Sequence, residues 1–329
     1  MESDPLLLDV LEQPRALRAA LEAGVPSGAL LRPPARLVLC GMGASYFATY
    51  PAYLHLLGAG ASACRLEAGE LLHFGGGVLD GPQTTLVVVS QSGRSAEVLR
   101  LLGARGGAVV VGVTNDPDSP LGRGADVVVP LRAGRERAGV ATKTVACSLL
   151  VCDLLCGAPA SAWPPVIAAV EDLLVRRQLW LPELLSALGG AEDVFVLGRG
   201  PGLAAAWAIA LMLKEAGAVH AEGLSAPQFR HGPLESARPG RAGLVLVTPG
   251  EAGGFDLELA AEMAAAGMAV AALCPEPRPV PPGVSSFPWP SAAPAALLVA
   301  GQLLARAYAL RRGVVPGTFR RVGKVTTRE

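Results

Sequence analysis

Lysine is nearly absent from this sequence. Of the 28 basic residues, only Lys143, Lys214 and Lys324 are lysine, and all the others are arginine. Arginine serves at least as well in surface charge and in ion pairs, but it cannot lose its proton to become an amine nucleophile. Each remaining lysine is therefore a candidate for a specific role, unless a codon bias alone left these three by chance.

The chain also lacks an excess of charge and a long hydrophobic run. Basic and acidic residues number 28 each, so no overall field attracts nucleic acid or an anionic membrane. The longest uncharged run, 279–305, contains six prolines, and its proline-free end is shorter than the roughly 20 residues that span a bilayer. The acidic start has no basic segment of a signal peptide. We expect no transmembrane helix and a cytoplasmic protein.

Metal and nucleotide motifs are missing as well. The six cysteines form neither a dense disulfide framework nor a Cys-x-x-Cys metal pair. Cys152 and Cys156, one helical turn apart, are most simply buried apolar residues. No Walker loop occurs, and Gly41-x-Gly43-x-x-Tyr46 lacks the third glycine of the dinucleotide fingerprint. We therefore expect no metal, no organic cofactor and no disulfides, as in a reducing compartment.

The composition that remains is that of a large globular protein. Apolar residues make up 51% of the 329 residues and charged residues 17%, which allows a large core to be buried. Short apolar runs at 36–40, 85–89, 108–113 and 126–130 alternate with helical patterns, of which the first is predicted from Tyr46 to about Leu57. Continuous Val and Leu runs between helices are typical of a parallel sheet covered on both faces. The first half therefore predicts an α/β domain.

The second half repeats this rhythm. Residues 193–200 match 36–43 at an offset of 157, and the run 244–247 echoes the second strand of the first half. A Pro- and Ala-rich stretch at 157–165 separates the halves, and a helical pattern follows it to about Leu188. The sequence predicts an α/β protein of two tandem doubly wound parallel-sheet domains, 1–160 and 161–329.

A serine-rich loop follows the second predicted strand. At a strand-to-helix junction, backbone N–H groups and hydroxyls converge on one anion, for which a phosphate monoester is the natural fit. A plain capping turn is the alternative. The corresponding loop of the second half, 248–251, contains a proline and a carboxylate and is a poorer cradle. The loop of the first half consists of Ser90, Gln91, Ser92, Gly93, Arg94 and Ser95.

Three further residues could carry chemistry. Glu215 ends a largely apolar helix, where desolvation could raise its pKa toward the range of a general base. His231 lies in a Gly-Pro loop and could shuttle a proton. Lys324 lies in the tail and could form a Schiff base with a sugar carbonyl. Taken singly, a solvated helix end, a loop histidine and a frayed tail are the plainer interpretations.

Together these residues resemble the sugar isomerase (SIS) domain family. Its motifs recur in order over nearly all of the chain from Arg36 onward. The resemblance extends to proteins with two SIS domains of flavodoxin-like fold, both glucosamine-fructose-6-phosphate aminotransferases and stand-alone glucosamine-6-phosphate deaminases. The matching segments are 43–45, 90–95, 136–143 (which we expect to open the last helix of the first half), 198–200, 213–215, 220–222, 229–233 and 324–326.

The resemblance implies roles for individual residues. Glu215 matches the family's isomerisation base, His231 the ring-opening histidine that reaches the site from the neighbouring subunit, and Lys324 the Schiff-base lysine. A homodimer is implied. The resemblance further implies that the phosphate and sugar are held by Ala44, Ser45, Ser90, Gln91, Ser92, Ser95 and Val140.

Two departures bear on the activity. Met212 and Ala208 stand where the family usually has lysine and glutamate, which puts the full synthase reaction in doubt. We also expect no glutaminase domain. A deaminase that converts glucosamine 6-phosphate to fructose 6-phosphate and ammonia is favoured. The alternatives are an aminotransferase-like protein without its glutaminase, a deglycase or isomerase for another phosphosugar, and a non-catalytic phosphosugar sensor.

Overall fold

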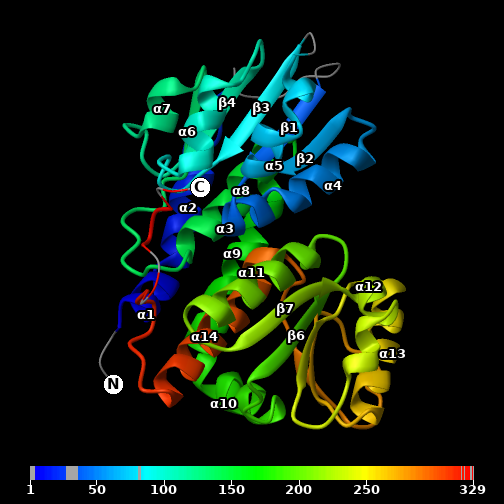
Figure 1. The fold of residues 1–329 in the computed structure, drawn as a ribbon. Coiled ribbons are helices and arrows are strands. Elements are labelled where there is room, and N and C mark those ends of the chain that lie inside the picture. Colours follow the sequence, from blue (N-terminus) through cyan, green and yellow to red (C-terminus); the bar gives the residue numbers. More distant parts are fainter. Residues whose placement is uncertain are drawn as a thin grey trace. The chain divides into compact units, whose positions relative to one another are not determined.

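The computed structural model describes residues 4–26, 36–80, 83–319, 321, 323–326 and 328. The chain divides into two compact units, each with its own parallel sheet (Figure 1). We call them the serine-loop unit (Glu12–Pro164 with Phe319–Glu329) and the α11 unit (Met1–Leu11 with Pro165–Thr318). The division near residue 164 lies close to the predicted one, but each unit also takes one terminal segment from the other half of the chain.

The serine-loop unit contains a five-stranded parallel sheet of order β2-β1-β3-β4-β5. Helices α5, α6 and α7 contribute to one apolar cluster on this sheet, and α8 packs against α2, α3 and α4. The strands are β1 (Arg36–Gly41), β2 (Ala63–Glu67), β3 (Thr84–Val89), β4 (Val109–Thr114) and β5 (Val127–Pro130). The helices are α2 (Gln13–Ala23), α3 (Gly43–Ala48), α4 (Tyr50–Gly58), α5 (Ala68–His73), α6 (Ala96–Gly103), α7 (Pro120–Gly124) and α8 (Lys143–Leu155).

The α11 unit has the same topology, with strand order β10-β9-β8-β6-β7. Helix α11 packs against α14, β6 and β7, whereas α12 and α13 contribute to a separate apolar cluster. The strands are β6 (Asp193–Gly198), β7 (His220–Ser225), β8 (Ala242–Leu246), β9 (Ala269–Cys274) and β10 (Val284–Pro288). The helices are α1 (Pro5–Leu11), α9 (Trp163–Val175), α10 (Arg177–Ala187), α11 (Gly202–Glu215), α12 (Ala226–Arg230), α13 (Ala252–Ala265) and α14 (Pro294–Arg311).

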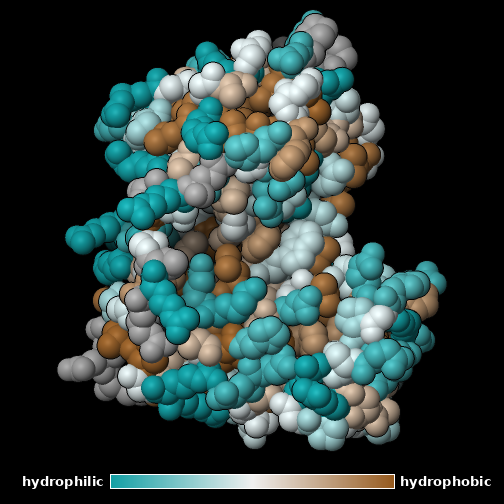
Figure 2. Space-filling view, viewed as in Figure 1, coloured by the Kyte–Doolittle hydropathy of each residue, from teal (hydrophilic) through white to brown (hydrophobic). Residues whose placement is uncertain are grey.

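The predicted fold class is confirmed. Both sheets are all-parallel, and β6, β7, β8, β9 and β10 are arranged as β1, β2, β3, β4 and β5 are in the first sheet. An order of 2-1-3-4-5 is the flavodoxin-like form of the doubly wound fold. Within the described residues, no helix is long and apolar enough to cross a membrane, and hydrophilic residues are spread over the visible surface of both units (Figure 2).

Three strands escaped the sequence prediction, and two predicted helices are each divided. The missed strands β2, β7 and β10 lie at sheet edges and contain polar residues, so they lack the continuous apolar run of a central strand. The predicted helix 46–57 is divided at Thr49, next to Pro51, whose missing N–H cannot continue a helix. The predicted helix up to Leu188 is divided at Arg176.

Candidate functional site

The serine loop joins β3 to α6 at the carboxyl end of the central strand, where open α/β sheets bind ligands. Ser90 is buried, and its Oγ accepts the N–H of Gly93 at 3.2 Å. Ser92 Oγ accepts the N–H of Arg94 at 3.2 Å. Because a serine hydroxyl both donates and accepts, these bonds leave each O–H free to donate to a ligand.

Gln91 and Ser95 complete the loop. The carbonyl oxygen of Gln91 accepts the N–H of Asn115 at 3.1 Å, which ties the loop to the end of β4. Ser95 is the N-cap residue of α6, yet its side chain caps no helix N–H. The Arg94 guanidinium pairs with Asp116 at 2.8 Å and lowers the pKa of that carboxyl group. Because the Arg94 guanidinium is paired with Asp116, the serine hydroxyls are the principal groups of this loop that can donate a hydrogen bond to an anion.

A glycine is required at the bend of this loop. Gly93 has a φ of 61°, and a methyl group built at this position overlaps the Ser119 hydroxyl. Ser119 cannot move freely, because it caps α7 by accepting the N–H of Gly122. The loop therefore depends on both the left-handed conformation and the close approach that glycine allows.

Replacing Gly93 by alanine tests this dependence. We expect Gly93→Ala to lower the free energy of unfolding by about 2–4 kcal/mol, from left-handed strain and overpacking. We expect the phosphate monoester predicted for this loop to bind at least about tenfold more weakly, because the donors no longer converge. Calorimetry and thermal melts measure both effects. Gly107→Ala, a position with open space and an ordinary φ, is the control; equal behaviour of the two variants would contradict the prediction.

The segment 43–45 follows β1 on the same edge of the sheet. Ala44 and Ser45 are half-buried in the first turn of α3. Arg65 on β2 holds this short helix in place, since its Nε donates to Thr49 Oγ1 at 2.8 Å and its guanidinium donates to the Tyr46 carbonyl at 2.7 Å. β1 and β3 are paired neighbours, so this turn and the serine loop follow adjacent strands.

The segment 136–144, which we call the strap, is not the helix start that the sequence predicted. Helix α8 begins only at Lys143, and the residues before it form a loop. Glu136 is 8% exposed and accepts the N–H of Thr142 at 2.7 Å, so its carboxylate competes with helical bonding at this point. Val140 is buried in the middle of the strap.

Two lysines of the serine-loop unit, Lys143 and Lys324, each hold distant segments of this unit together. Lys143 is 1% exposed and forms an ion pair with Glu12 at 2.5 Å, and Arg137 also pairs with Glu12. The hydrogen bonds of Arg137, together with Lys143, lower the pKa of Glu12 to about 2. Lys324, from the tail, donates to backbone carbonyls of the strap. Lys143 therefore joins α8 to the residue before α2, and Lys324 anchors the tail.

Glu215 and His231 belong to the α11 unit. Glu215 is the last residue of α11 and is exposed, yet burial among the surrounding protein atoms raises its pKa to about 7. A carboxyl group with such a pKa can accept and return a proton near neutral pH. Met212 and Ala208, on the same helix, are buried apolar residues.

His231 follows α12 at its C-terminal end and is exposed. Its backbone N–H donates to the Gln228 carbonyl at 3.1 Å, and Gly232 after it has a φ of 130°. The ring therefore projects from a tight turn, open to a ligand or to another chain. The structure thus groups Ala44, Ser45, Ser90, Gln91, Ser92, Ser95, Val140 and Lys324 in one unit, and Glu215 and His231 in the other.

The loop of the second half that corresponds to the serine loop already holds carboxylates of its own chain. The N–H of Thr248 donates to Asp256 at 2.9 Å, and the N–H of Gly250 donates to Glu276 at 3.3 Å. Arg199 pairs with Asp256, which is fully buried. Because these amides face negative charges, a phosphate has no place there, in agreement with the poorer cradle expected from the sequence.

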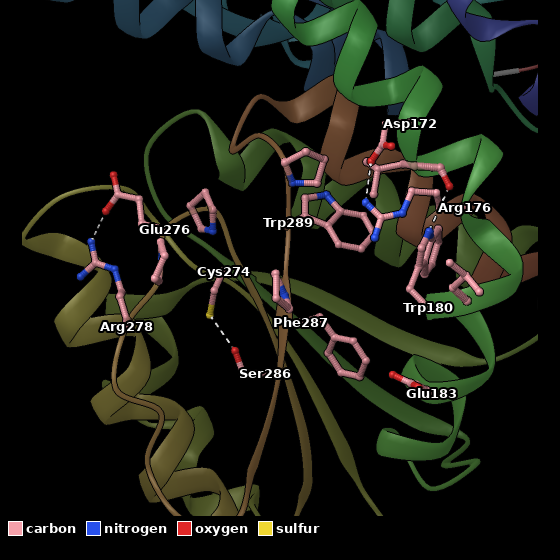
Figure 3. A pocket seen from close by; sticks show the side chains of 16 residues that line it. Asp172, Arg176, Trp180, Glu183, Cys274, Glu276, Arg278, Ser286, Phe287 and Trp289 are labelled. Atoms are coloured by element: carbon pink, nitrogen blue, oxygen red, sulfur yellow. Dashed lines mark hydrogen bonds and ion pairs between the residues drawn. The ribbon is translucent and has the colours of Figure 1, made fainter.

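The α11 unit also contains a pocket of about 680 Å³ between α10 and the ends of β9 and β10 (Figure 3). Trp180 and Trp289 meet edge-on at a centroid distance of 5.0 Å, and Phe287 lies below them in the view. The charged residues that line the pocket include two ion pairs, Asp172–Arg176 and Glu276–Arg278. None of the predicted site residues lines it.

Among the residues that the structure describes, no group of three or more His, Cys, Asp or Glu side chains could hold a metal ion. All six cysteines are free thiols, and burial raises the pKa of Cys147 well above that of an exposed thiol, so this thiol stays protonated. Cys152 is buried in α8 and Cys156 is buried directly after this helix, as expected of small apolar residues.

Several structural partners of the site were not singled out from the sequence. Glu12 holds Lys143 from 131 residues away, and Thr142 and Thr144 bind Glu136. Thr326, in the tail, accepts the first N–H of α6. The scarcity of lysine drew attention to Lys143 and Lys324, but no spacing in the sequence indicates which groups they contact.

Comparison with known proteins agrees with this description. Residues 30–157 match the SIS domain family. Over 98% of its length the chain is 33% identical to the glutamine-fructose-6-phosphate aminotransferase (isomerizing) of Aeropyrum pernix, of which it spans 57%. The C-terminal domain of glucosamine-fructose-6-phosphate aminotransferase from Francisella tularensis superimposes with a TM-score of 0.83 at 20% identity, covering 96% of this chain and 98% of that one.

A solved structure that is named as a different enzyme also resembles this chain. Glucosamine-6-phosphate deaminase from Thermotoga maritima superimposes with a TM-score of 0.72 at 19% identity, and the match covers 98% of this chain and 99% of that one. Likeness at this level of identity establishes the common fold. It extends over both units of the chain, whereas the family match covers the first half.

Proposed function

This chain is an SIS-domain protein, and from that premise we propose that it is a phosphosugar aldose-ketose isomerase and deaminase. The proposed reaction converts glucosamine 6-phosphate and water to fructose 6-phosphate and ammonia. The observation that carries the proposal is the position of the serine loop at the carboxyl end of the central strand β3, where α/β proteins bind ligands. Glu215, at the end of α11, supports it as the base, because its raised pKa of about 7 suits a group that takes a proton and returns it. The serine loop supports a substrate that carries a phosphate, because the oxygens of Ser90 and Ser92 accept hydrogen bonds within the loop and their O–H groups can donate to the phosphate.

The chemistry assigns one task to each side chain. His231 assists opening of the sugar ring. Glu215 removes the proton from C2 of the open chain and returns it to C1, while a proton passes from the amine to O1, which turns the aldehyde and amine into a C1 alcohol and a C2 imine. Addition of water to this imine releases ammonia and leaves the ketose carbonyl. Lys324 binds that carbonyl carbon as a Schiff base, formed with loss of water and reversed by its return.

An aminotransferase-type reaction is the second candidate. The name of the Aeropyrum pernix relative favours it, because that protein is the isomerizing glutamine-fructose-6-phosphate aminotransferase. Against it stands the apolar environment of α11, where Met212 and Ala208 are buried at positions that resemble a lysine and a glutamate of the aminotransferases. We therefore favour the direction that releases ammonia. We further propose that the protein works in the cytoplasm as a homodimer, with His231 serving the partner subunit.

The test mixes the purified protein with glucosamine 6-phosphate and measures ammonia and fructose 6-phosphate in the same samples. We expect both products in equal amounts from the wild type. Lys324→Arg keeps the charge but cannot form an imine, so we expect it to lose at least about 99% of the rate. Its melting temperature should rise with the sugar phosphate as that of the wild type does.

The remaining outcomes separate the alternatives. Product formation only in the reverse direction, from fructose 6-phosphate with ammonia or a glutaminase partner, favours the aminotransferase type. Stabilisation by glucosamine 6-phosphate without any product contradicts the deaminase and leaves a sensor or an enzyme for another phosphosugar. A panel of hexose and pentose phosphates then distinguishes these two.

A further inference from the structure

The tail of the chain contacts two segments of the serine-loop unit at once. Lys324 Nζ donates to the backbone carbonyls of Glu136 and Ala138, at 2.6 Å each. Two residues further on, the carbonyl of Thr326 accepts the N–H of Ala96, at the start of α6. Residues 324–326 therefore connect the strap to the helix that follows the serine loop.

The carboxylate of Glu136 gives the strap its shape. One oxygen accepts the N–H of Thr142 at 2.7 Å, the hydroxyl of Thr142 at 2.8 Å and the N–H of Thr144 at 3.2 Å. The other oxygen accepts the Thr144 hydroxyl. These four bonds close residues 136–144 into a loop, and the two carbonyls that hold Lys324 lie on that loop.

A carboxylate suits this position because every group that faces it there is a donor. An ionised carboxylate has about four lone-pair sites and no hydrogen, so it can satisfy all four donors at once. Because Glu136 is 8% exposed, water has little access to the donors that it serves. Without this side chain the N–H groups of Thr142 and Thr144 lose their hydrogen-bond partner, and the bonds that hold the strap in its conformation are gone.

We propose that Glu136 is a positioning residue for Lys324. Its carboxylate does not touch the amine in the structure. Instead, it folds the strap so that two carbonyls form a seat for the tail amine, while the Thr326 carbonyl joins the tail to the start of α6. The inference rests on the proposed function for the role of Lys324, but the seat itself is a structural claim that can be tested without any activity.

The first experiment measures how well Lys324 reaches a sugar carbonyl. Incubation with fructose 6-phosphate and cyanoborohydride reduces the imine formed at Lys324 to a stable secondary amine, and mass spectrometry quantifies the labelled peptide. We expect Glu136→Ala to slow labelling by about tenfold or more, because the amine is no longer placed. The same variant should lower kcat more than it raises KM. Glu136→Gln, which keeps the shape and part of the bonding, should recover most of the labelling.

A matched control lies next to Glu136 in the sequence. The Arg137 side chain belongs to the strap but pairs with Glu12 rather than with Thr142 or Thr144. We expect Arg137→Gln to be labelled at the wild-type rate. A loss of labelling in this variant equal to that of Glu136→Ala would overturn the specific role of Glu136.

The second experiment uses the scarcity of lysine. A lysine-specific endoprotease has three sites in this chain; Lys143 is buried, whereas Lys214 and Lys324 are exposed. The protease must bind the lysine ammonium group, which the carbonyls of Glu136 and Ala138 hold in the docked tail. The rate of cleavage after Lys324, measured against cleavage after Lys214, therefore reports undocking of the tail. We expect Glu136→Ala to accelerate this cleavage by about tenfold, and Thr144→Val, which removes one donor, to accelerate it less. Thermal melts show whether each variant is folded.

The outcomes of the two experiments are distinguishable. If the wild type forms neither product nor labelled peptide, the proposed function fails, and proteolysis alone decides on the seat. If Glu136→Ala is cleaved after Lys324 at the wild-type rate, the seat does not depend on Glu136 and the inference is overturned, whatever the activity. Should Glu136→Ala fail to fold, Thr144→Val provides the comparison, because it removes one of the four bonds to the Glu136 carboxylate; cleavage after Lys324 at the wild-type rate in this variant would then overturn the inference.

Discussion

We expect the replacement of Glu215 by glutamine to lower kcat for glucosamine 6-phosphate by about 10²–10⁴-fold, the usual contribution of a general base. Glutamine has nearly the same shape but cannot accept the C2 proton. The serine loop lies in the other unit, so phosphosugar binding should survive, and KM should change little. Steady-state kinetics and calorimetry measure the two effects. Comparable activity of the wild type and Glu215→Gln would remove Glu215 from the mechanism.

The pH profile gives an independent check on the same residue. Burial raises the pKa of Glu215 to about 7, and only the ionised carboxylate can accept a proton. We therefore expect kcat/KM of the wild type to rise about tenfold per pH unit below pH 7 and to level off above it. The residual activity of Glu215→Gln should lack this step. A wild-type profile that is flat between pH 5.5 and 8.5 would contradict the assignment.

The same raised pKa of Glu215 makes stability depend on pH in the direction opposite to activity: activity should rise with pH, whereas the stability of the fold should fall. Ionising Glu215 costs more in the folded protein than in the unfolded chain, whose glutamates titrate near about 4.3. Its contribution to stability is therefore fully present below that pH and is lost as the pH rises through about 7. We expect Glu215→Gln to melt at a higher temperature than the wild type at pH 8 and at the same temperature at pH 4.

Mixing two inactive variants restores activity if His231 serves the partner subunit. A dimer that contains one Glu215→Gln chain and one His231→Ala chain has one site with both substitutions and one site with neither. Random pairing of equal amounts places half of the dimers in this mixed form, so about a quarter of the wild-type rate should return. Co-expression of the two chains with different tags, followed by purification of the mixed dimer, should yield about half.

A matched control excludes recovery from other causes. When Glu215→Gln is combined with a chain carrying both substitutions, every site lacks the base, and no activity should return. Light scattering establishes the dimer in each case. Mixed dimers that form but stay inactive would show that His231 acts within its own chain or not at all.

Much of the fold could be predicted from local patterns. The central strands β1, β3, β4, β6, β8 and β9 are apolar runs, which only a sheet covered on both faces can bury. The repeat of 36–43 at 193–200 indicated two copies of one topology, which the strand orders confirm. The edge strands β2, β7 and β10 were not predictable, because half-buried edges tolerate polar residues.

The sequence by itself determined the candidate chemistry. The serine loop, the carboxylate at the end of an apolar helix, the histidine beside Gly-Pro and three rare lysines are all visible without a structure. The positive φ of Gly93 and the short capping turns also follow from residue type, because they depend on neighbours only a few positions away.

Only the tertiary structure decided what the lysines and carboxylates do. Lys143 is paired with a residue 131 positions away, and Lys324 with a carbonyl 188 positions away. Asp256 and Glu276 fill the loop of the second half. Ionic and hydrogen-bonding partners meet through packing of distant segments, and a buried donor donates to whichever oxygen that packing brings to it. Residue type therefore indicated which lysines and carboxylates are candidates for chemistry, and the fold decided which of them form ion pairs and hydrogen bonds within the protein.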